Sequence, residues 1–383
     1  MNPIEAATSP DPYPFYAELV STKPFHFDEQ LQIWIASSAS AVSAVLSHEH
    51  CKVRPHSEPV PKGLLGSDAG EIFGALMRMN DGSIHCPLKR SILQAASPDV
   101  VAECRRLSVS MAGSFIRKAS STSSVFVVRR MMFELPVCVI GAMLGIPETD
   151  WLSLVPEVSA FVSGIAPTAT AEQSIVGNCA AKGLSRRLEE ATSRKRHTGA
   201  LLDAFAKSCA EKEIGRDSIA ANAVGFLFQT YEATAGLIGN SIRMLANNPD
   251  LVSELGRNRS FLRQFMAEVL RFDSPVQNTR RYVFEDTILE DKHLPHGAQV
   301  LVLLAAANRD PSRFPNPDEF DLQRSDAFSF AFGLDHHECP GQSFVYEIAA
   351  ASLEALLSTC FSWEQFARPL RYRPSVNTRI PLY

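Results

Sequence analysis

Apolar residues recur at helical spacing over most of the chain, and this pattern predicts a mainly helical fold. The predicted helices cover residues 12–20, a segment starting at 41–46, and residues 100–119, 125–144, 217–248, 260–272 and 342–360. Gly145-Ile146-Pro147 is expected to end the helix over 125–144. Asp217 or Ser218 is expected to cap one helix and Ser260 another, because short polar side chains favour that position.

Strand-like segments are few and short. They cover residues 31–36, 281–284, 287–289, 299–304 and part of the C-terminal tail. Residues 308–330 are rich in Pro, Asp and Phe and are expected to be irregular but packed. The fold class is therefore mainly α with small β regions.

The helix over residues 217–248 is the longest one predicted. Some 30 residues at ~1.5 Å each would span about 45 Å. Because this segment is also strongly apolar, we expect it to cross the core of the molecule.

Composition narrows the class of protein. With 383 residues and 45% apolar residues, the chain can form a sizeable core and is not disordered. The net charge is -5, and no long run of Lys or Arg favours a nucleic-acid partner. No stretch of about 20 apolar residues suggests a membrane span, and the N-terminus does not resemble a signal peptide. The expectation is a soluble, cytoplasmic protein.

The eight cysteines are scattered, without a zinc-type cluster, and most are expected to be ordinary core or surface thiols. Cys339 differs in context. It lies near the end of the polar segment over residues 332–341, just before a predicted helix. Backbone N–H groups and the helix dipole stabilise a thiolate in such a place, and that thiolate can ligate a metal. An ordinary buried thiol is an equally good interpretation of these ten residues alone.

Two further segments of the C-terminal half carry charged residues among apolar ones. Glu268 and Arg271 lie three apart on one face of a predicted helix, which favours a buried ion pair. Asn308-Arg309-Asp310-Pro311 begins the irregular segment, which supplies a further arginine at Arg324.

Together these segments resemble the cytochrome P-450 family, and the resemblance extends over essentially the whole chain. The cysteine loop, the Glu-x-x-Arg helix and the Asn-Arg-Asp-Pro segment occur in the family's order. Asp11-Pro12-Tyr13-Pro14-Phe15-Tyr16 and Ile33-Trp34-Ile35 are similar to the bacterial branch. The resemblance implies a single haem-thiolate domain over residues 1–383 that holds haem b (iron protoporphyrin IX).

The resemblance also implies roles for individual residues. Cys339 would be the proximal iron ligand, and its loop would contribute Phe332, Gly333 and Gly341 to the haem site. Glu268, Arg271 and Arg324 would form a structural triad. The haem propionates would be bound by His85, Lys89, Arg281 and His337. The family usually has arginine where Lys89 stands, so Arg90 is an alternative partner.

The long helix departs from the family where dioxygen is activated. The family pattern of a small residue, glycine, any residue, an acid and threonine is matched here by residues 229–233, Gln-Thr-Tyr-Glu-Ala. Glu232 keeps the acid, but Ala233 replaces the threonine, and the next hydroxyl is Thr234, ~100° further around the helix. Three interpretations remain open: a substrate hydroxyl or a water relays protons, Thr230 does so, or the reaction differs from simple oxygen insertion.

The expected function is oxidation of a small, partly apolar organic substrate with O2 and two electrons, secondary metabolites being one candidate class. A ferredoxin or similar separate donor would dock near the Cys339 face, because 383 residues leave no room for a fused reductase. By position, the substrate pocket would include residues 58–80, 151–170, 276–279 and 376–378, among them Phe226, Gln229, Val276, Asn278 and Asn377. The alternatives are coupling, desaturation, rearrangement or peroxide-driven oxidation, and a haem-binding sensor without turnover. A further alternative makes Cys339 an ordinary thiol without haem.

Overall fold

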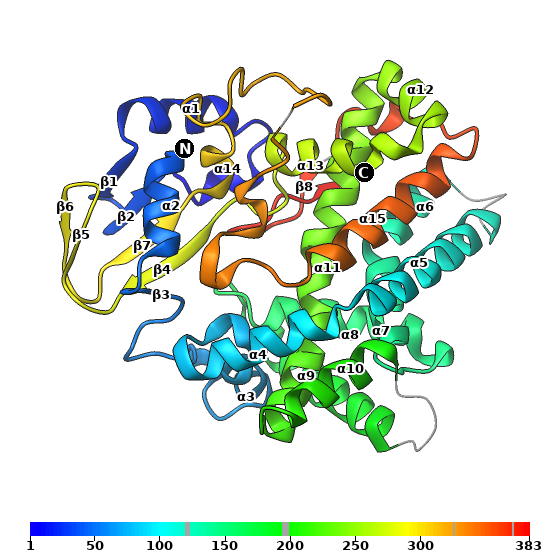
Figure 1. Cartoon of the computed structure of the whole chain (residues 1–383), viewed down its shortest axis with the longest axis horizontal. Coiled ribbons are helices and arrows are strands. Elements are labelled where there is room, and N and C mark those ends of the chain that lie inside the picture. The colour runs from blue at the N-terminus through cyan, green and yellow to red at the C-terminus, as the bar shows by residue number, and fades with distance from the viewer. Residues whose placement is uncertain (119–122, 194–198, 325, 370) are drawn as a thin grey trace. The chain divides into compact units, whose positions relative to one another are not determined.

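The computed structural model describes residues 1–118, 123–193, 199–324, 326–369 and 371–383 (Figure 1). Its first helices are α1 (Tyr13–Thr22), α2 (Ala39–Ser47), α3 (Asp68–Ala75), α4 (Gly82–Ala95), α5 (Pro98–Lys118), α6 (Ser124–Arg129), α7 (Leu135–Met143) and α8 (Trp151–Gly164). The later ones are α9 (Ala171–Ser193), α10 (Ala200–Ala210), α11 (Arg216–Asn247), α12 (Pro249–Arg257), α13 (Leu262–Phe272), α14 (Leu304–Ala307) and α15 (Gln342–Leu357). The strands are β1 (Phe25–Asp28), β2 (Ile33–Ala36), β3 (Cys51–Lys52), β4 (Thr279–Val283), β5 (Thr287–Leu289), β6 (Lys292–Leu294), β7 (Gln299–Val302), β8 (Arg371–Tyr372) and β9 (Pro381–Leu382).

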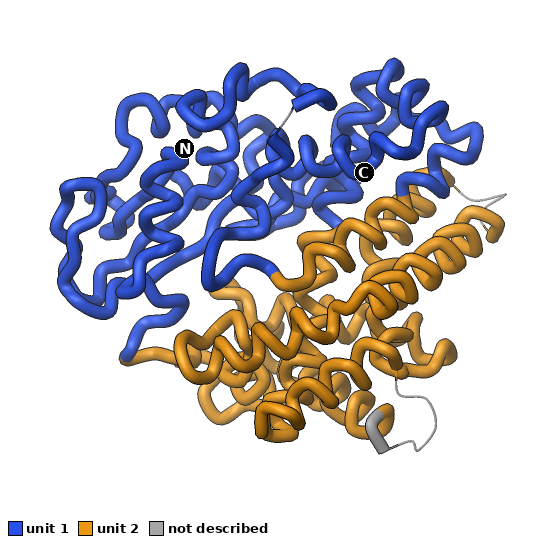
Figure 2. Tube along the Cα trace, viewed as in Figure 1, with its two compact units in different colours: residues 1–56, 235–339, 353–383 blue, residues 57–234, 340–352 orange. Residues whose placement is uncertain are grey.

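The chain folds into two compact units, each assembled from separate stretches of sequence (Figure 2). Unit 1 comprises residues 1–56, 235–339 and 353–383, and unit 2 comprises residues 57–234 and 340–352. Two of the boundaries, after residues 234 and 352, fall within α11 and α15, so each of these helices belongs partly to both units. The mainly helical architecture with small sheets matches the predicted fold class.

Unit 1 contains a five-stranded sheet in the order β1-β2-β7-β4-β3. Strands β2 and β7 are parallel, with Ile35 opposite Leu301, and the other neighbours are antiparallel. Side chains alternate between the two faces of a strand. Leu301 therefore packs with α1 and α14, whereas Val300 and Val302 pack with α2.

Unit 2 is helical, and two of its helices approach unusually closely. A Cβ on Gly164 of α8 would lie 2.6 Å from the Cα of Gly177 in α9. Only glycine permits such a backbone approach, because any larger residue at either position would overlap the other helix. This contact fixes where α8 and α9 cross.

Most predicted elements are present, but the helix expected over residues 125–144 is interrupted. A π-helical turn over Arg130–Glu134, labelled η4, separates α6 from α7. Pro136 has no N–H and cannot donate the next hydrogen bond of a regular α-helix, which accounts for the wider turn. Gly145 follows α7 with a φ of +80°, in agreement with the predicted helix end.

Two predicted helix caps are wrong. Asn258, rather than Ser260, caps the turn before α13, since its Oδ1 accepts a hydrogen bond from the Ser260 N–H at 3.0 Å. Helix α11 begins at Arg216, so that Asp217 lies within its first turn instead of preceding it. Propensity identifies several candidate caps, and packing of the preceding chain selects among them.

The region over residues 58–80, which is expected by position to line the substrate pocket, contains α3. Ser67 caps α3 by accepting a hydrogen bond from the Gly70 N–H at 3.1 Å. Asn178 of α9 also contributes, because its Oδ1 accepts from the Ala69 N–H at 3.1 Å. The predicted helix over residues 100–119 corresponds to α5, with its last residue outside the described ranges.

Candidate haem-thiolate site

The loop that carries Cys339 is fixed by backbone hydrogen bonds. The Cys339 N–H donates to the Phe332 carbonyl at 2.8 Å, and the Gly333 N–H donates to the Phe330 carbonyl at 2.8 Å. Gly333 has φ +76° and ψ -162°, a conformation essentially restricted to glycine. The loop therefore needs glycine here to bring the backbone of Phe332 and Cys339 together.

Asp335 also has a left-handed conformation, with a φ of +58°. In the family that the sequence resembles, glycine is common at this position. A left-handed backbone explains that preference, and aspartate is among the residues that tolerate it best. The departure from the family pattern thus preserves the path of the loop toward Cys339.

Cys339 is half-buried and precedes α15 by three residues, whereas the other cysteines are either buried or more exposed. Burial raises the pKa of Cys51 to about 11 and the pKa values of Cys104 and Cys138 to about 12. Such thiols stay protonated at neutral pH and are poor metal ligands. The half-buried Cys339 is therefore better placed than these three buried cysteines to supply a thiolate ligand.

The predicted charged triad is brought together in unit 1. Arg271 binds Glu268 through two parallel hydrogen bonds of 2.7 and 2.8 Å, and both residues are buried. The Arg324 Nε lies 3.3 Å from the same carboxylate. Arg271 also donates to the carbonyls of Asn308, Pro317 and Glu319. One buried guanidinium thus ties α13 to the irregular segment that follows α14.

Asn308 connects this charged cluster to the cysteine loop. Its carbonyl accepts from Arg271, and its side-chain Oδ1 accepts from the Phe330 N–H at 2.7 Å. Its Nδ2 donates to the Ser274 Oγ at 2.8 Å. Since Phe330 in turn accepts the Gly333 N–H, a continuous hydrogen-bonded path runs from Arg271 to the loop of Cys339.

The predicted propionate partners are distributed over both units. Arg281 of β4 is 4% exposed, and its Nη1 donates to the Arg280 carbonyl at 2.9 Å. His337 is half-buried in the turn before Cys339. His85 of α4 is buried, and Lys89, one turn later on the same face, is half-buried. Arg90 is exposed and turned away from that face, which favours Lys89 over the arginine alternative.

Helix α11 presents one partly exposed stripe in its middle. Its residues are spaced as on a single helix face and are Phe226, Gln229, Thr230 and Ala233. Glu232 is partly exposed beside the stripe, whereas Thr234 is fully buried. The hydroxyl of Thr230 donates to the Phe226 carbonyl at 2.7 Å. The Thr234 Oγ1 has no hydrogen-bond partner among the described residues.

The remaining predicted pocket residues lie together in unit 1. Val276 forms a β-bridge with Thr378, and the Gln277 N–H donates to the Asn377 carbonyl at 2.8 Å. The Asn278 side chain is buried and donates to the Val376 carbonyl at 2.9 Å. The side chains of Val276 and Asn377 are partly exposed, while the Asn278 amide mainly fixes the local backbone.

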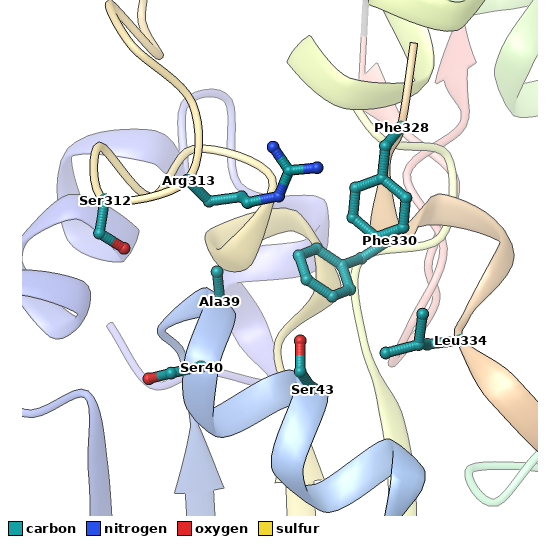
Figure 3. Close-up of a pocket in the computed structure, with 8 residues that line it drawn as sticks. All are labelled: Ala39, Ser40, Ser43, Ser312, Arg313, Phe328, Phe330 and Leu334. Atoms are coloured by element: carbon teal, nitrogen blue, oxygen red, sulfur yellow. The ribbon is translucent and has the colours of Figure 1, made fainter. Parts of the chain in front are cut away.

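A surface pocket of about 320 Å³ adjoins the cysteine loop within unit 1 (Figure 3). Its lining residues are Ala39, Ser40, Ser43, Ser312, Arg313, Phe328, Phe330 and Leu334. Phe330 and Leu334 belong to the segment that leads to Cys339, so any group seated in the pocket would contact that segment. None of the residues predicted from sequence to bind haem or substrate lines this pocket.

Sequence reasoning missed two residues that organise the stripe of α11. Asn222 is buried and fastens residues 75–77 to the helix, and Gly225 makes room for Gln229. Both are poor helix formers within an apolar helix, which was a signal of close packing or tertiary hydrogen bonding. Their partners could not be identified without the tertiary structure.

Two kinds of feature are absent from the described residues. No group of three or more His, Cys, Asp or Glu side chains in this part of the chain is arranged to hold a metal ion. None of the described helices is both long and apolar enough to cross a membrane.

The chain is similar in sequence to known cytochromes P-450. The model of the cytochrome P-450 family matches residues 137–366, more than half of the chain. The biotin biosynthesis cytochrome P-450 of Bacillus subtilis (strain 168) is 27% identical over 374 residues, which cover 96% of this chain and 94% of that protein.

Two solved structures extend the similarity over the whole fold. The crystal structure of CalO2 has a TM-score of 0.85 and 26% identity, and the alignment covers 100% of this chain and 96% of that one. The crystal structure of P450BioI with an acyl carrier protein ligated to hexadec-9Z-enoic acid has a TM-score of 0.83 and 25% identity, covering 97% and 96%.

The chain therefore belongs to the cytochrome P-450 family. It is a haem-dependent monooxygenase of that family, as the sequence resemblance implied.

Proposed function

We propose that Cys339 is the proximal ligand of a haem b iron. The supporting observation is the half-buried thiol placed just before α15 in a loop that Gly333 shapes and a hydrogen bond to Phe332 closes. The donor set suits haem, because it combines one thiol with buried or half-buried basic side chains that can pair with carboxylates. When bound, thiolate-ligated haem supplies the reductive cleavage of dioxygen.

Several side chains would hold the cofactor. Phe332, Gly333 and Gly341 would shape the loop around the thiolate ligand. Arg281, His337, His85 and Lys89 would bind the propionates. Glu268, Arg271 and Arg324 would act at a distance, by fixing the segment that positions the cysteine loop.

The proton path would depend on α11. Glu232 would supply the acid, and Ala233 would leave space for a water or a substrate hydroxyl. Thr230 shares the stripe, but its hydroxyl proton is engaged by the Phe226 carbonyl, so it would relay a proton only after that bond breaks. Thr234 is buried off the stripe and is the weaker candidate.

The substrate would be a small, partly apolar organic molecule, with secondary metabolites as one candidate class. Phe226, Gln229, Val276, Asn278 and Asn377 would line its pocket. Two electrons would come from a ferredoxin or a similar separate donor, and residues 1–383 would serve as a single haem-thiolate domain. Because P450BioI was solved with an acyl carrier protein, a carrier-bound acyl chain is a further substrate form to test.

The test is the absorption spectrum of the purified protein after reduction with dithionite and exposure to carbon monoxide. We expect a strongly red-shifted Soret band that disappears in Cys339→Ala and persists in Cys360→Ala, a control at an exposed cysteine. An unshifted band in the wild-type protein would mean another ligand. Absence of any haem band would overturn the proposed haem function and leave only the similarity of fold.

The alternative reactions are separated by isotope labelling. With labelled dioxygen, a monooxygenase product carries one labelled oxygen, whereas coupling, desaturation and rearrangement products carry none. Ala233 is the observation that motivates this second experiment. A protein that binds gaseous ligands but never consumes reductant with any substrate would instead be a sensor.

A further inference from the structure

The partly exposed stripe of α11 offers little polar chemistry. Phe226 is apolar and is held by an edge-to-face contact with Phe205, whose ring centroid is 5.2 Å away. Ala233 has no polar side-chain atom, and the Thr230 hydroxyl already donates to the backbone. Gln229 is therefore the residue of the stripe that offers both a hydrogen-bond donor and an acceptor.

The amide of Gln229 has a defined position but no hydrogen bond from its side chain to another described residue. A Cβ on Gly225 would lie 2.7 Å from the Gln229 Nε2, which is closer than real Cβ atoms come to other heavy atoms. The amide thus lies over Gly225, and a Cβ at this position would force the Gln229 side chain to move. Helical side chains lean toward the N-terminus of their helix, which explains this direction.

Leu76 also packs against Gly225. The same Cβ would lie 3.0 Å from the Leu76 Cδ2, and Leu76 is fully buried. The amide of Gln229 and the side chain of Leu76 therefore both approach the space that a Cβ on Gly225 would occupy.

Asn222 holds Leu76 in this place. Its Oδ1 accepts from the Met77 N–H at 2.9 Å, and its Nδ2 donates to the Ala75 carbonyl at 2.9 Å. These two bonds fasten the backbone on both sides of Leu76 to α11. Since Asn222 is itself 2% exposed, the bonds form away from competing water.

We propose that Asn222 and Gly225 are positioning residues that hold Gln229 as the specificity-determining polar contact of the substrate pocket. The substrate class that fits is a largely apolar molecule with one hydroxyl or carbonyl group directed at the Gln229 amide. This inference rests on the proposed haem function of the chain. Gln229 replaces the small residue that the family usually has at this position with a group that selects for substrate polarity.

The experiment measures binding, not turnover, with probes that ligate haem iron through an imidazole. The holoenzyme is titrated with 4-phenylimidazole and with its ortho-, meta- and para-hydroxyphenyl derivatives, and the Soret shift gives each Kd. At least one hydroxyl isomer should bind about fivefold more tightly than the parent, the size expected for one net hydrogen bond. The quantity compared is the Kd of the parent probe divided by the Kd of a hydroxyl isomer. A change in pocket volume affects both probes and therefore cancels in this ratio.

Two substitutions distinguish a direct contact between Gln229 and the ligand from the positioning role of Gly225. Gln229→Leu should reduce the ratio to about one, because the volume is nearly kept and the amide is lost. Gly225→Ala should reduce it as well, because the new Cβ displaces the amide. The double variant Gln229→Leu with Gly225→Ala should show the same ratio as Gln229→Leu alone, because the amide that Gly225 positions is already lost. Gly256→Ala is the matched control, since its Cβ would meet nothing within 4 Å on the exposed face of α12.

Each outcome decides a separate statement. A ratio near one for every isomer in the wild-type protein, or an unchanged ratio in Gln229→Leu, would overturn the role of Gln229. A ratio lost in Gln229→Leu but kept in Gly225→Ala would overturn the positioning role. Absence of a haem Soret band, and therefore of any shift with the parent probe, would overturn the haem function and this inference together. Gln229 is partly exposed, so its variant remains a test even if Gly225→Ala does not fold.

Discussion

At the scale of single residues, backbone conformation decides how Cys339 is presented. Gly333 has backbone angles that a side chain would make strongly unfavourable, and Asp335 has a left-handed φ that aspartate tolerates. The hydrogen bond from the Cys339 N–H to the Phe332 carbonyl depends on this path. The position of the Cys339 thiol is thus controlled by the backbone conformation of the residues that precede it.

Gly333→Ala tests this control. The substitution should lower the free energy of unfolding by about 1–3 kcal/mol, the usual range for a residue forced into this backbone region. It should also convert part of the red-shifted carbon monoxide band into an unshifted one, because the thiolate is no longer held in place. Denaturant unfolding and the reduced spectrum measure the two effects. Unchanged stability would show that the loop can rearrange around the new side chain.

At the scale of secondary structure elements, buried polar groups fasten α13 to the segment over residues 308–330. Arg271 carries most of these contacts, with Glu268 as its counter-charge. The described residues of this segment form no regular hydrogen-bonded ladder, and arginine side chains donate to several of its backbone carbonyls. This arrangement replaces secondary structure as the support for the cysteine loop.

Glu268→Ala should lower the free energy of unfolding by about 3–5 kcal/mol, because two arginines would lose their buried counter-charge. Glu103→Ala is a matched control, since Glu103 and Arg106 form an ion pair with the same spacing on the more exposed face of α5. Glu103→Ala should lower the free energy of unfolding by less than about 1 kcal/mol. Chemical denaturation of both variants gives the comparison, and equal losses would contradict the structural role of the triad.

The pocket beside α2 leads to a prediction about electron transfer. If a ferredoxin-type donor docks near the Cys339 loop, filling the pocket of Figure 3 with Ser43→Trp should slow reduction by the donor about tenfold or more. Reduction by dithionite, a small molecule that needs no docking surface, should be unchanged. Ser47→Trp on the same helix, outside the pocket, is the control. Equal effects of both variants would place the docking surface elsewhere.

At the scale of the whole molecule, widely separated parts of the chain meet at Asp273 within unit 1. Tyr13 donates to its carboxylate at 2.8 Å, Arg243 of α11 at 2.8 Å and Arg379 near the C-terminus at 2.9 Å. Arg379 also donates to the carbonyls of Ser9 and Pro10. Both ends of the sequence are thereby fixed to the long helix through one buried carboxylate.

This cluster predicts a pH dependence of stability. Burial by itself raises the pKa of Asp273, but the charges of Arg379 and Arg243 outweigh burial and hold the pKa below its usual value of 3.8. The carboxylate is therefore ionised in the folded state, and its contribution to stability is present above pH ~4 and lost as pH falls further through the lowered pKa.

The measurement is the unfolding free energy of the wild-type protein and of Asp273→Asn between pH 7 and pH 3. The variant should be less stable at pH 7, and the difference between the two proteins should shrink as the pH falls below 4. A difference that stays constant over this range would mean that the charge of Asp273 is not what stabilises the cluster.

The sequence by itself determined the mainly helical fold, the extent of α11 to within a residue at each end and the place of Cys339 before α15. These features depend on local periodicity, on helix-ending residues and on order along the chain, all of which are readable in one dimension. The pairing of Glu268 with Arg271 was readable for the same reason, since both lie on one helix face.

Only the tertiary structure decided which side chains α11 presents and what holds them. Asn222 and Gly225 act through Leu76, a residue about 150 positions away in the sequence, and Asn308 links Arg271 to Phe330 across separate segments. The hydroxyl of Thr230 lies on the partly exposed face of α11 and donates to the Phe226 carbonyl, whereas Thr234 is fully buried. Such contacts arise when distant segments pack together, and no local pattern specifies them.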